Sequence, residues 1–293
     1  MVTLRRRERP CRTDGERDCP GCLSCQLKGR GNAVSNTPNT IVNHWPKASC
    51  AKAFWSQREL PPYRRLLRDT AAWLDPQPGQ RWLDLGCGSG QLTRTLWEKS
   101  RGQLAEIIAL DCAAHDERAI DQIRNSVQPT AGERQIRFLH ADFSDGLAGF
   151  DTHSLDGVVS GLAIQYAESY SEQHSGWTTD AYEHLLADVC RVLRPGGTFV
   201  FSVNVPEPAW SKIALYGIPG FFRSSHPLRY VKNSMRMLRY GAWLKREARR
   251  GRFHYLPAVV VADKLTQAGF VAIEHRTSFA GQADVFRCRT ALG

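Results

Sequence analysis

The sequence predicts an α/β fold with a mostly parallel sheet, in which short apolar strands alternate with helices. The most informative stretch is Leu83–Gly90, where an apolar strand runs directly into a turn rich in glycine. Further apolar strands follow, separated by segments long enough to hold a crossover helix. Parallel strands need such crossovers, so the alternation indicates a sheet that is covered by helices.

The glycine turn is the first candidate site. Gly86, Gly88 and Gly90 permit positive φ angles and let the backbone approach a ligand without a Cβ in the way. Helical spacing follows over 91–97, so the turn presents free N–H groups and the positive end of a helix dipole. A dinucleotide site would have its third glycine one place later, where this chain has Gln91. The spacing therefore favours a nucleoside ligand that carries no pyrophosphate.

Two polar positions after later strands fit the same ligand. The strand Glu106–Asp111 ends in a carboxylate about twenty residues beyond the glycines, where it can accept from both hydroxyl groups of a ribose. The strand Ile136–His140 is followed by Asp142 and Phe143, a carboxylate beside an aromatic ring. This pair suits an adenine, whose exocyclic amine donates hydrogen bonds.

The remaining elements continue the alternation of helices and strands. A helix with one apolar face precedes the glycine turn, and two alternating strands close the chain. We expect, in order, a helix over 63–73, a strand over 155–160, a helix end, turn and strand over 191–201, a helix over 258–269, and strands over 270–277 and 284–290.

In this order the motifs resemble the class I S-adenosylmethionine-dependent methyltransferases, particularly their small-molecule, methyltransferase type 11-like branch. The resemblance covers roughly 82–203 and is most specific at Leu83–Gly90, Ala141–Phe143 and Leu193–Gly197. It implies a doubly wound, seven-stranded, Rossmann-like sheet with an antiparallel C-terminal edge hairpin, and S-adenosylmethionine as cofactor. The residues that it places around the cofactor are Asp84, Gly86, Cys87, Gly88, Gly90, Asp111, Cys112, Asp142, Phe143, Ser160 and Gly161.

The methyl acceptor is less constrained by the sequence, because a sulfonium methyl group is already activated and the enzyme mainly aligns the acceptor. After the fourth strand, the chain lacks the Asn/Asp-Pro-Pro-Tyr tetrapeptide with which amino-methylating relatives hold a planar amine. Gln165 and Tyr166 either orient a small molecule or simply begin a helix. We select no catalytic residue, although a base is conceivable at His174, His184, His226 or His254.

Charge is concentrated in two segments of this chain, whose net charge is +10. Residues 1–30 hold eight Lys and Arg against four acidic residues, and residues 207–255 hold eleven against two. The second segment lies in a basic helical insert over 206–255, in which apolar residues recur at helical spacing beside a basic stripe. These residues are Leu228, Val231, Met235, Leu238 and Ala242, with Arg229, Lys232, Arg236 and Arg239.

We expect this insert to be a lid, with Met235 and Leu238 packed over the methyl end of the cofactor. The alternatives are a helix with a solvated basic face, an anionic membrane contact or an RNA contact. The expected function is methyl transfer from S-adenosylmethionine to a small-molecule O, N or C acceptor. An RNA methyltransferase and a non-catalytic methyltransferase-like assembly factor are the alternative functions.

An Arg- and Cys-rich N-terminal extension over 1–50 precedes a methyltransferase domain over 51–293. The extension contains Cys11, Cys19, Cys22 and Cys25, whose thiolates could converge on zinc or an iron–sulfur cluster or could be incidental. The nine cysteines are an odd number, which fits reduced thiols better than disulfides. No secretory signal or membrane-spanning run is evident, so we expect a cytoplasmic protein.

Overall fold

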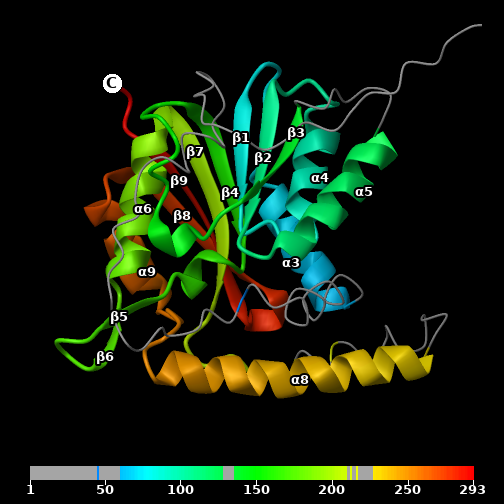
Figure 1. The fold of residues 1–293 in the computed structure, drawn as a ribbon, viewed down its shortest axis with the longest axis vertical. Coiled ribbons are helices and arrows are strands. Elements are labelled where there is room, and N and C mark those ends of the chain that lie inside the picture. The colour runs from blue at the N-terminus through cyan, green and yellow to red at the C-terminus, as the bar shows by residue number, and fades with distance from the viewer. Residues whose placement is uncertain (1–44, 46–59, 128–134, 210–211, 213–215, 217–226) are drawn as a thin grey trace, which may run out of the picture. The chain divides into compact units, whose positions relative to one another are not determined.

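The computed structural model describes residues 45, 60–127, 135–209, 212, 216 and 227–293. Its main feature is a seven-stranded sheet (Figure 1). The strands are β1 (Arg81–Leu85), β2 (Glu106–Asp111), β3 (Ile136–His140), β4 (Leu155–Gly161), β7 (Leu193–Asn204), β8 (Phe270–Ser278) and β9 (Ala283–Thr290). They lie in the order β3-β2-β1-β4-β7-β9-β8.

The strand directions confirm the predicted fold class. All pairs among β1, β2, β3, β4 and β7 are parallel. The C-terminal strands form the expected antiparallel hairpin, and β9 also pairs antiparallel with β7. The last strand of the chain therefore lies inside the sheet, and β8 forms its edge.

Helices cover both faces of the sheet, which explains why its strands are apolar at successive positions. The helices are α3 (Pro61–Ala71), α4 (Gln91–Lys99), α5 (Glu117–Val127), α6 (Asp180–Val192), α8 (Pro227–Arg249) and α9 (Ala258–Gln267). Leu83 and Leu85 pack on one face with residues of α6 and α9, whereas Trp82 packs on the other with residues of α3, α4 and α5. Figure 1 shows α4 and α5 on one side of the sheet and α6 and α9 on the other.

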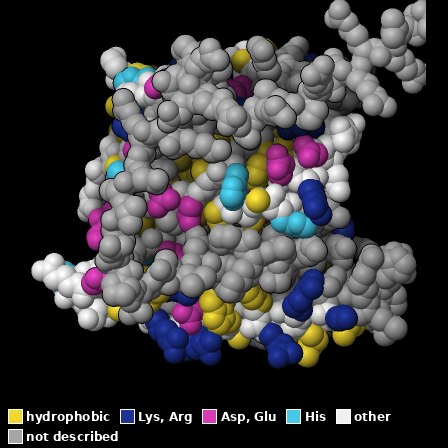
Figure 2. All heavy atoms as spheres, in the orientation of Figure 1, with side chains coloured by type: hydrophobic (Ala, Val, Ile, Leu, Met, Phe, Trp, Pro, Cys, Tyr) yellow, Lys and Arg dark blue, Asp and Glu magenta, His cyan; other side chains and the backbone are white. Residues whose placement is uncertain are grey.

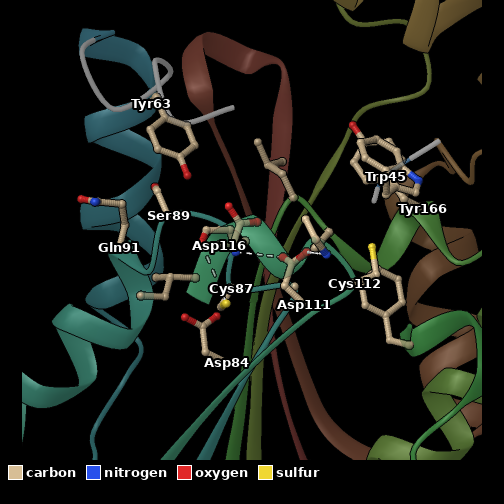
Figure 3. Close-up of a pocket in the computed structure, with 18 residues that line it drawn as sticks. Trp45, Tyr63, Asp84, Cys87, Ser89, Gln91, Asp111, Cys112, Asp116 and Tyr166 are labelled. Atoms are coloured by element: carbon tan, nitrogen blue, oxygen red, sulfur yellow. Dashed lines mark hydrogen bonds between the residues drawn. The ribbon is translucent and has the colours of Figure 1, made fainter. Parts of the chain in front are cut away.

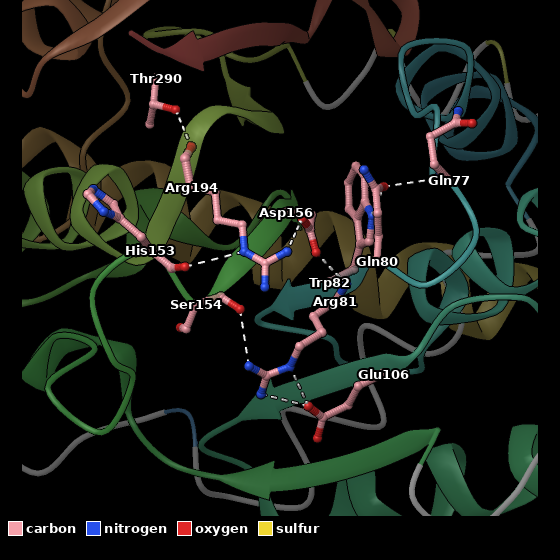
Figure 4. A network of polar contacts seen from close by, with 10 residues as sticks. All are labelled: Gln77, Gln80, Arg81, Trp82, Glu106, His153, Ser154, Asp156, Arg194 and Thr290. Atoms are coloured by element: carbon pink, nitrogen blue, oxygen red, sulfur yellow. Dashed lines mark hydrogen bonds and ion pairs between the residues drawn. The ribbon is translucent and has the colours of Figure 1, made fainter. Parts of the chain in front are cut away.

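A polar network joins the strands where β1 and β4 begin (Figure 4). The Arg81 guanidinium donates to Glu106 at 2.9 Å and to the carbonyl oxygen of Ser154 at 3.1 Å. The Asp156 carboxylate accepts from the backbone N–H of Arg81 and from the Arg194 guanidinium, each at 2.7 Å. Partly exposed ion pairs contribute little stability on their own. Their effect here is to align β1, β2, β4 and β7 at this end of the sheet.

The basic insert differs from the predicted lid. Val231 and Met235, one helical turn apart on α8, are 46% and 56% exposed. The predicted packing of Met235 over the pocket is therefore wrong, because this face of α8 points to solvent together with basic side chains (Figure 2). The insert instead buries Leu244, Phe253 and Tyr255, which form a hydrophobic cluster with Tyr166.

The hairpin of β5 (Ser169–Ser171) and β6 (Gly176–Thr178) was not predicted. The short helix η4 (Ile164–Tyr166) forms at Gln165 and Tyr166, where the start of a helix was one of the two interpretations. Within the described part of the chain, no helix has the length and apolar character needed to cross a bilayer.

Candidate functional site

The glycine turn after β1 shapes a pocket through three glycines with different roles. All three have positive φ, at +74° for Gly86, +47° for Gly88 and +70° for Gly90. A Cβ on Gly86 would lie 2.3 Å from the Cβ of Ala163, and one on Gly90 would lie 2.4 Å from Ile123. A Cβ on Gly88 would meet no atom within 4 Å. Gly86 and Gly90 therefore permit close packing of the protein, whereas Gly88 leaves space for a ligand.

The pocket lies at the carboxyl ends of the parallel strands, where ligands bind in open α/β sheets (Figure 3). Eight residues proposed for the cofactor line it: Asp84, Gly86, Cys87, Gly88, Asp111, Cys112, Phe143 and Gly161. The other described lining residues are Trp45, Tyr63, Ser89, Gln91, Leu92, Ala113, Asp116, Leu162, Ala163 and Tyr166.

Three of the proposed cofactor residues are not among those that line the pocket. Gly90 caps the start of α4 in the left-handed conformation. The Asp142 carboxylate accepts from the backbone N–H of Ser144 at 2.9 Å, which orders the turn before Phe143. The buried Ser160 hydroxyl donates to the carbonyl oxygen of Leu85 at 2.7 Å and thereby ties β4 to the glycine turn. The geometry gives these three residues a supporting role around the pocket.

Asp111 holds the glycine turn in place and can still accept hydrogen bonds from a ligand. Its two carboxylate oxygens accept from the backbone N–H groups of Gly88 and Ala113, both at 2.9 Å. Burial raises the pKa of Asp111, and these backbone donors oppose the rise. Each carboxylate oxygen has more than one lone pair, so the two oxygens can also accept from neighbouring hydroxyl groups of a ligand.

Among the described lining residues, Asp84 has a buried polar atom without a hydrogen-bond partner. One of its oxygens accepts from the backbone N–H of Thr93 at 2.8 Å and from the Thr93 hydroxyl at 2.6 Å. Its other oxygen, Oδ1, is buried and has no hydrogen-bond partner among the described residues. Burial raises the pKa of Asp84 to about 7, and the nearby Asp111 carboxylate adds to the effect. Such a group favours a ligand that brings positive charge and hydrogen-bond donors.

The loop after β4 holds its residues at the pocket by a strained backbone. Leu162 has a φ of +54°, which a branched residue adopts only at some energetic cost. Its N–H donates to the carbonyl oxygen of Ser202 at 3.0 Å and to the Ser202 hydroxyl at 3.1 Å. These two contacts stabilise the conformation that turns Leu162, Ala163 and Tyr166 toward the pocket.

Aromatic residues from distant segments line the pocket, with Tyr63 on one side and Trp45 and Tyr166 on the other (Figure 3), and two of them were missed. Trp45 lies in the segment that we assigned to the N-terminal extension, and its ring centroid is 4.5 Å from that of Tyr166. Tyr63 lies on the predicted first helix, but nothing in its spacing distinguishes it from a packing residue. Tyr166, which we considered as an orienting residue, does line the pocket. Only tertiary contacts could identify Trp45 and Tyr63.

The Tyr166 hydroxyl belongs to a buried hydrogen-bond network. It lies 3.0 Å from the Tyr255 hydroxyl, and the side-chain amide of Asn204 donates to it at 3.5 Å. Burial raises the pKa of Tyr166 to about 12, and the pKa of Tyr255 also lies well above its ordinary value. Both phenols are therefore neutral at physiological pH. His254, one of the conceivable bases, is buried and its ring bonds the carbonyl oxygen of Ala167 at 2.8 Å.

The four N-terminal cysteines lie outside the described residues, and so does His226. Within the ranges that the structure describes, no group of three or more His, Cys, Asp or Glu side chains could hold a metal ion. The zinc or iron–sulfur site at Cys11, Cys19, Cys22 and Cys25 remains a prediction.

Sequence comparisons agree with this geometry. The profile of a family described as a methyltransferase domain matches residues 83–201, which contain the glycine turn and most of the pocket. A malonyl-[acyl-carrier protein] O-methyltransferase of Brevibacillus brevis is 24% identical over 216 residues, which are 72% of this chain and 63% of that protein. An uncharacterized chloroplastic methyltransferase of Arabidopsis thaliana is 28% identical over 142 residues, which are 48% of this chain and 36% of that protein. The chain thus spans less than two thirds of either relative.

Among solved structures, phosphoethanolamine N-methyltransferase 2 of Haemonchus contortus, in complex with S-adenosyl-L-methionine, matches with a TM-score of 0.52 and 12% identity. The match covers 83% of this chain and 57% of that one. At this identity the likeness establishes a shared fold.

Proposed function

We propose that this chain, whose residues 83–201 match a methyltransferase domain, is a class I S-adenosylmethionine-dependent enzyme that transfers the methyl group of S-adenosylmethionine to a small-molecule acceptor. The observation that carries this proposal is the chemistry of the pocket. The buried Asp84 has an oxygen without a partner among the described residues, Asp111 can accept from two hydroxyl groups, and Gly88, which donates to Asp111, leaves open space. S-adenosylmethionine brings the matching groups: an ammonium, a positively charged sulfonium and a ribose diol.

Different residues of the chain would bind different parts of the cofactor. Asp111 would accept from the ribose hydroxyls, Asp84 would face the ammonium group, and Phe143 with Cys112 would hold the adenine. When bound, the cofactor supplies an activated methyl group. The described residues Trp45, Leu162 and Tyr166 would exclude water and align the acceptor. Such alignment can lower a barrier by about 7–11 kcal/mol in favourable cases.

The lining of the pocket supports a small-molecule acceptor rather than RNA. Trp45, Tyr63, Leu162 and Tyr166 make much of its wall apolar or aromatic, and no described residue of α8 lines it. A relative of this chain is named for O-methylation of an acyl-carrier protein substrate. The RNA alternative relies on the basic side chains of α8, and it predicts retention on RNA that weakens steeply as salt rises.

Isothermal titration calorimetry with the full chain tests the proposal. We expect S-adenosylmethionine and S-adenosylhomocysteine to bind and NAD not to bind. Asp111→Ala should weaken both interactions about 10- to 100-fold, because one or two charge-assisted hydrogen bonds are lost. Asp121→Ala, at a half-exposed carboxylate of α5, is the matched control. Binding of NAD alone would refute the proposal, and unchanged affinity in Asp111→Ala would refute the ribose assignment.

A further inference from the structure

We propose that Tyr166 and Tyr255 form the acceptor subsite, and that the acceptor is a carboxylate whose non-reacting oxygen accepts a hydrogen bond from Tyr166. Tyr166 would touch the acceptor, and Tyr255 would act as a positioning residue through Tyr166. This inference rests on the proposed function and adds to it the chemical class of the acceptor.

The two tyrosines come from distant parts of the chain. Tyr166 lies on η4, directly after the strained turn at the end of β4, and lines the pocket beside Trp45 (Figure 3). Tyr255 follows α8 within the insert and contacts Tyr166, so the insert contacts the pocket wall through Tyr166. Both rings are almost fully buried, at 5% and 7% exposure, and Phe253 packs edge-on against Tyr166.

Among the described residues, a count of hydrogen-bonding protons leaves one hydroxyl group with a proton that no acceptor takes. The 3.0 Å contact between the two hydroxyls uses one of their two protons. The side-chain amides of Asn204 and Gln165 bond Tyr166 as donors, so neither adds an acceptor. The Asn204 carbonyl oxygen takes no hydrogen bond from either tyrosine. If Tyr255 donates to Tyr166, the proton of Tyr166 remains available at the pocket.

The other described residues of the pocket wall favour an acceptor that is a nucleophile without first losing a proton. Among the described lining residues there is no Lys, Arg or His. The three lining carboxylates, Asp84, Asp111 and Asp116, come from β1, β2 and the turn after β2, and none comes from the segments that carry Trp45 and Tyr166. An alcohol or an alkylammonium must lose a proton to become a nucleophile, whereas a carboxylic acid, with a pKa near 4, is ionised at neutral pH.

Neutral phenols are suitable partners for such an acceptor. With their pKa values raised, Tyr166 and Tyr255 keep their protons, and an O–H···O⁻ bond is about twice as strong as its neutral counterpart. One carboxylate oxygen would accept from Tyr166 while the other forms the new C–O bond to the methyl carbon. The S–C bond of the cofactor breaks with its electron pair left on sulfur. The products are a methyl ester and S-adenosylhomocysteine, and no proton changes place.

Ligand binding tests the inference separately from turnover. The full chain, saturated with S-adenosylhomocysteine, would be titrated calorimetrically with phenylacetate and hexanoate. The corresponding alcohols and amines, 2-phenylethanol, hexanol, 2-phenylethylamine and hexylamine, are the comparison probes. We expect the carboxylates to bind at least about 10-fold more tightly than the neutral and cationic probes. With S-adenosylmethionine, mass spectrometry should detect the methyl esters.

Conservative variants separate a role in binding from a role in folding. Tyr166→Phe should weaken phenylacetate binding about 10- to 100-fold. Tyr255→Phe should cause a smaller loss, because Tyr166 keeps its proton. Tyr170→Phe, at a tyrosine that is 41% exposed, is the control and should change nothing. Affinity for S-adenosylhomocysteine should stay near that of the unmodified chain in all three variants. Tyr166→Phe and Tyr255→Phe should lower the melting temperature by only a few degrees, because each removes one buried hydrogen bond.

Equal binding of carboxylates and alcohols, or no carboxylate binding by cofactor-loaded protein, would overturn the inference. So would a Tyr166→Phe protein that binds phenylacetate normally. Failure to bind S-adenosylhomocysteine at all would instead refute the proposed function, so the two failures are distinguishable.

Discussion

The buried Asp84 predicts that stability and cofactor binding depend on pH in opposite directions. In the folded chain its pKa is raised from an ordinary value of 3.8 to about 7, chiefly by burial. The folded state therefore holds a proton that the unfolded state has already lost between these two values. The contribution of Asp84 to the free energy of unfolding is greatest below pH about 4, falls as the pH rises toward 7, and is constant above that.

The magnitude follows from the size of the shift. One pKa unit corresponds to about 1.4 kcal/mol, so a shift of about three units lowers the free energy of unfolding by about 4 kcal/mol across this range. Asp84 is 1% exposed, so solvent screening removes little of this effect. In Asp84→Asn the contribution to the pH dependence should vanish, whereas the control Asp121→Asn should retain it. Urea unfolding between pH 4 and pH 8 measures the difference.

A cationic ligand reverses the preference, because it stabilises the ionised carboxylate. S-adenosylmethionine should therefore bind more tightly as the pH rises from 5 to 7, and should release a proton from Asp84 when it binds near pH 6. Calorimetry in buffers of different ionisation enthalpy counts that proton. A pH-independent affinity, or an equal proton release by Asp84→Asn, would refute the assignment of Asp84 to the positive end of the ligand.

Two further predictions follow from the glycine turn and from the N-terminal extension. Gly88→Ala places a Cβ in the pocket at a φ of +47°, so it should weaken S-adenosylhomocysteine binding at least about 10-fold in calorimetry. It should lower the free energy of unfolding by only about 1–2 kcal/mol. Normal binding would show that the ligand lies elsewhere. If the N-terminal cysteines bind a metal, protein purified without oxygen should contain near-stoichiometric zinc or iron by elemental analysis. Removal of residues 1–30 should abolish the metal content without affecting cofactor binding. Metal-free protein would refute the metal site.

Local patterns were sufficient for the sheet. Strands buried on both faces are apolar at successive positions, and their periodicity together with the glycines located β1, β2, β3 and β4 within a residue or two. Local patterns also predicted that Asp84, Gly88 and Asp111 share one pocket, because the carboxyl ends of adjacent parallel strands meet at one edge of a sheet. The lid prediction failed because helical spacing defines an apolar face but does not identify what that face packs against.

The sequence by itself determined the fold class, the order of the elements and the part of the pocket around the glycine turn, since each depends on short-range patterns and on the fixed geometry of a parallel sheet. Only the tertiary structure decided the part of the pocket around Trp45 and Tyr166. Trp45, Tyr166 and Tyr255 are up to 210 residues apart in the printed numbering and share no spacing rule, yet they form one aromatic and hydrogen-bonded wall. The raised pKa of Asp84 likewise comes from burial and from the neighbouring Asp111, which no single segment of the chain encodes.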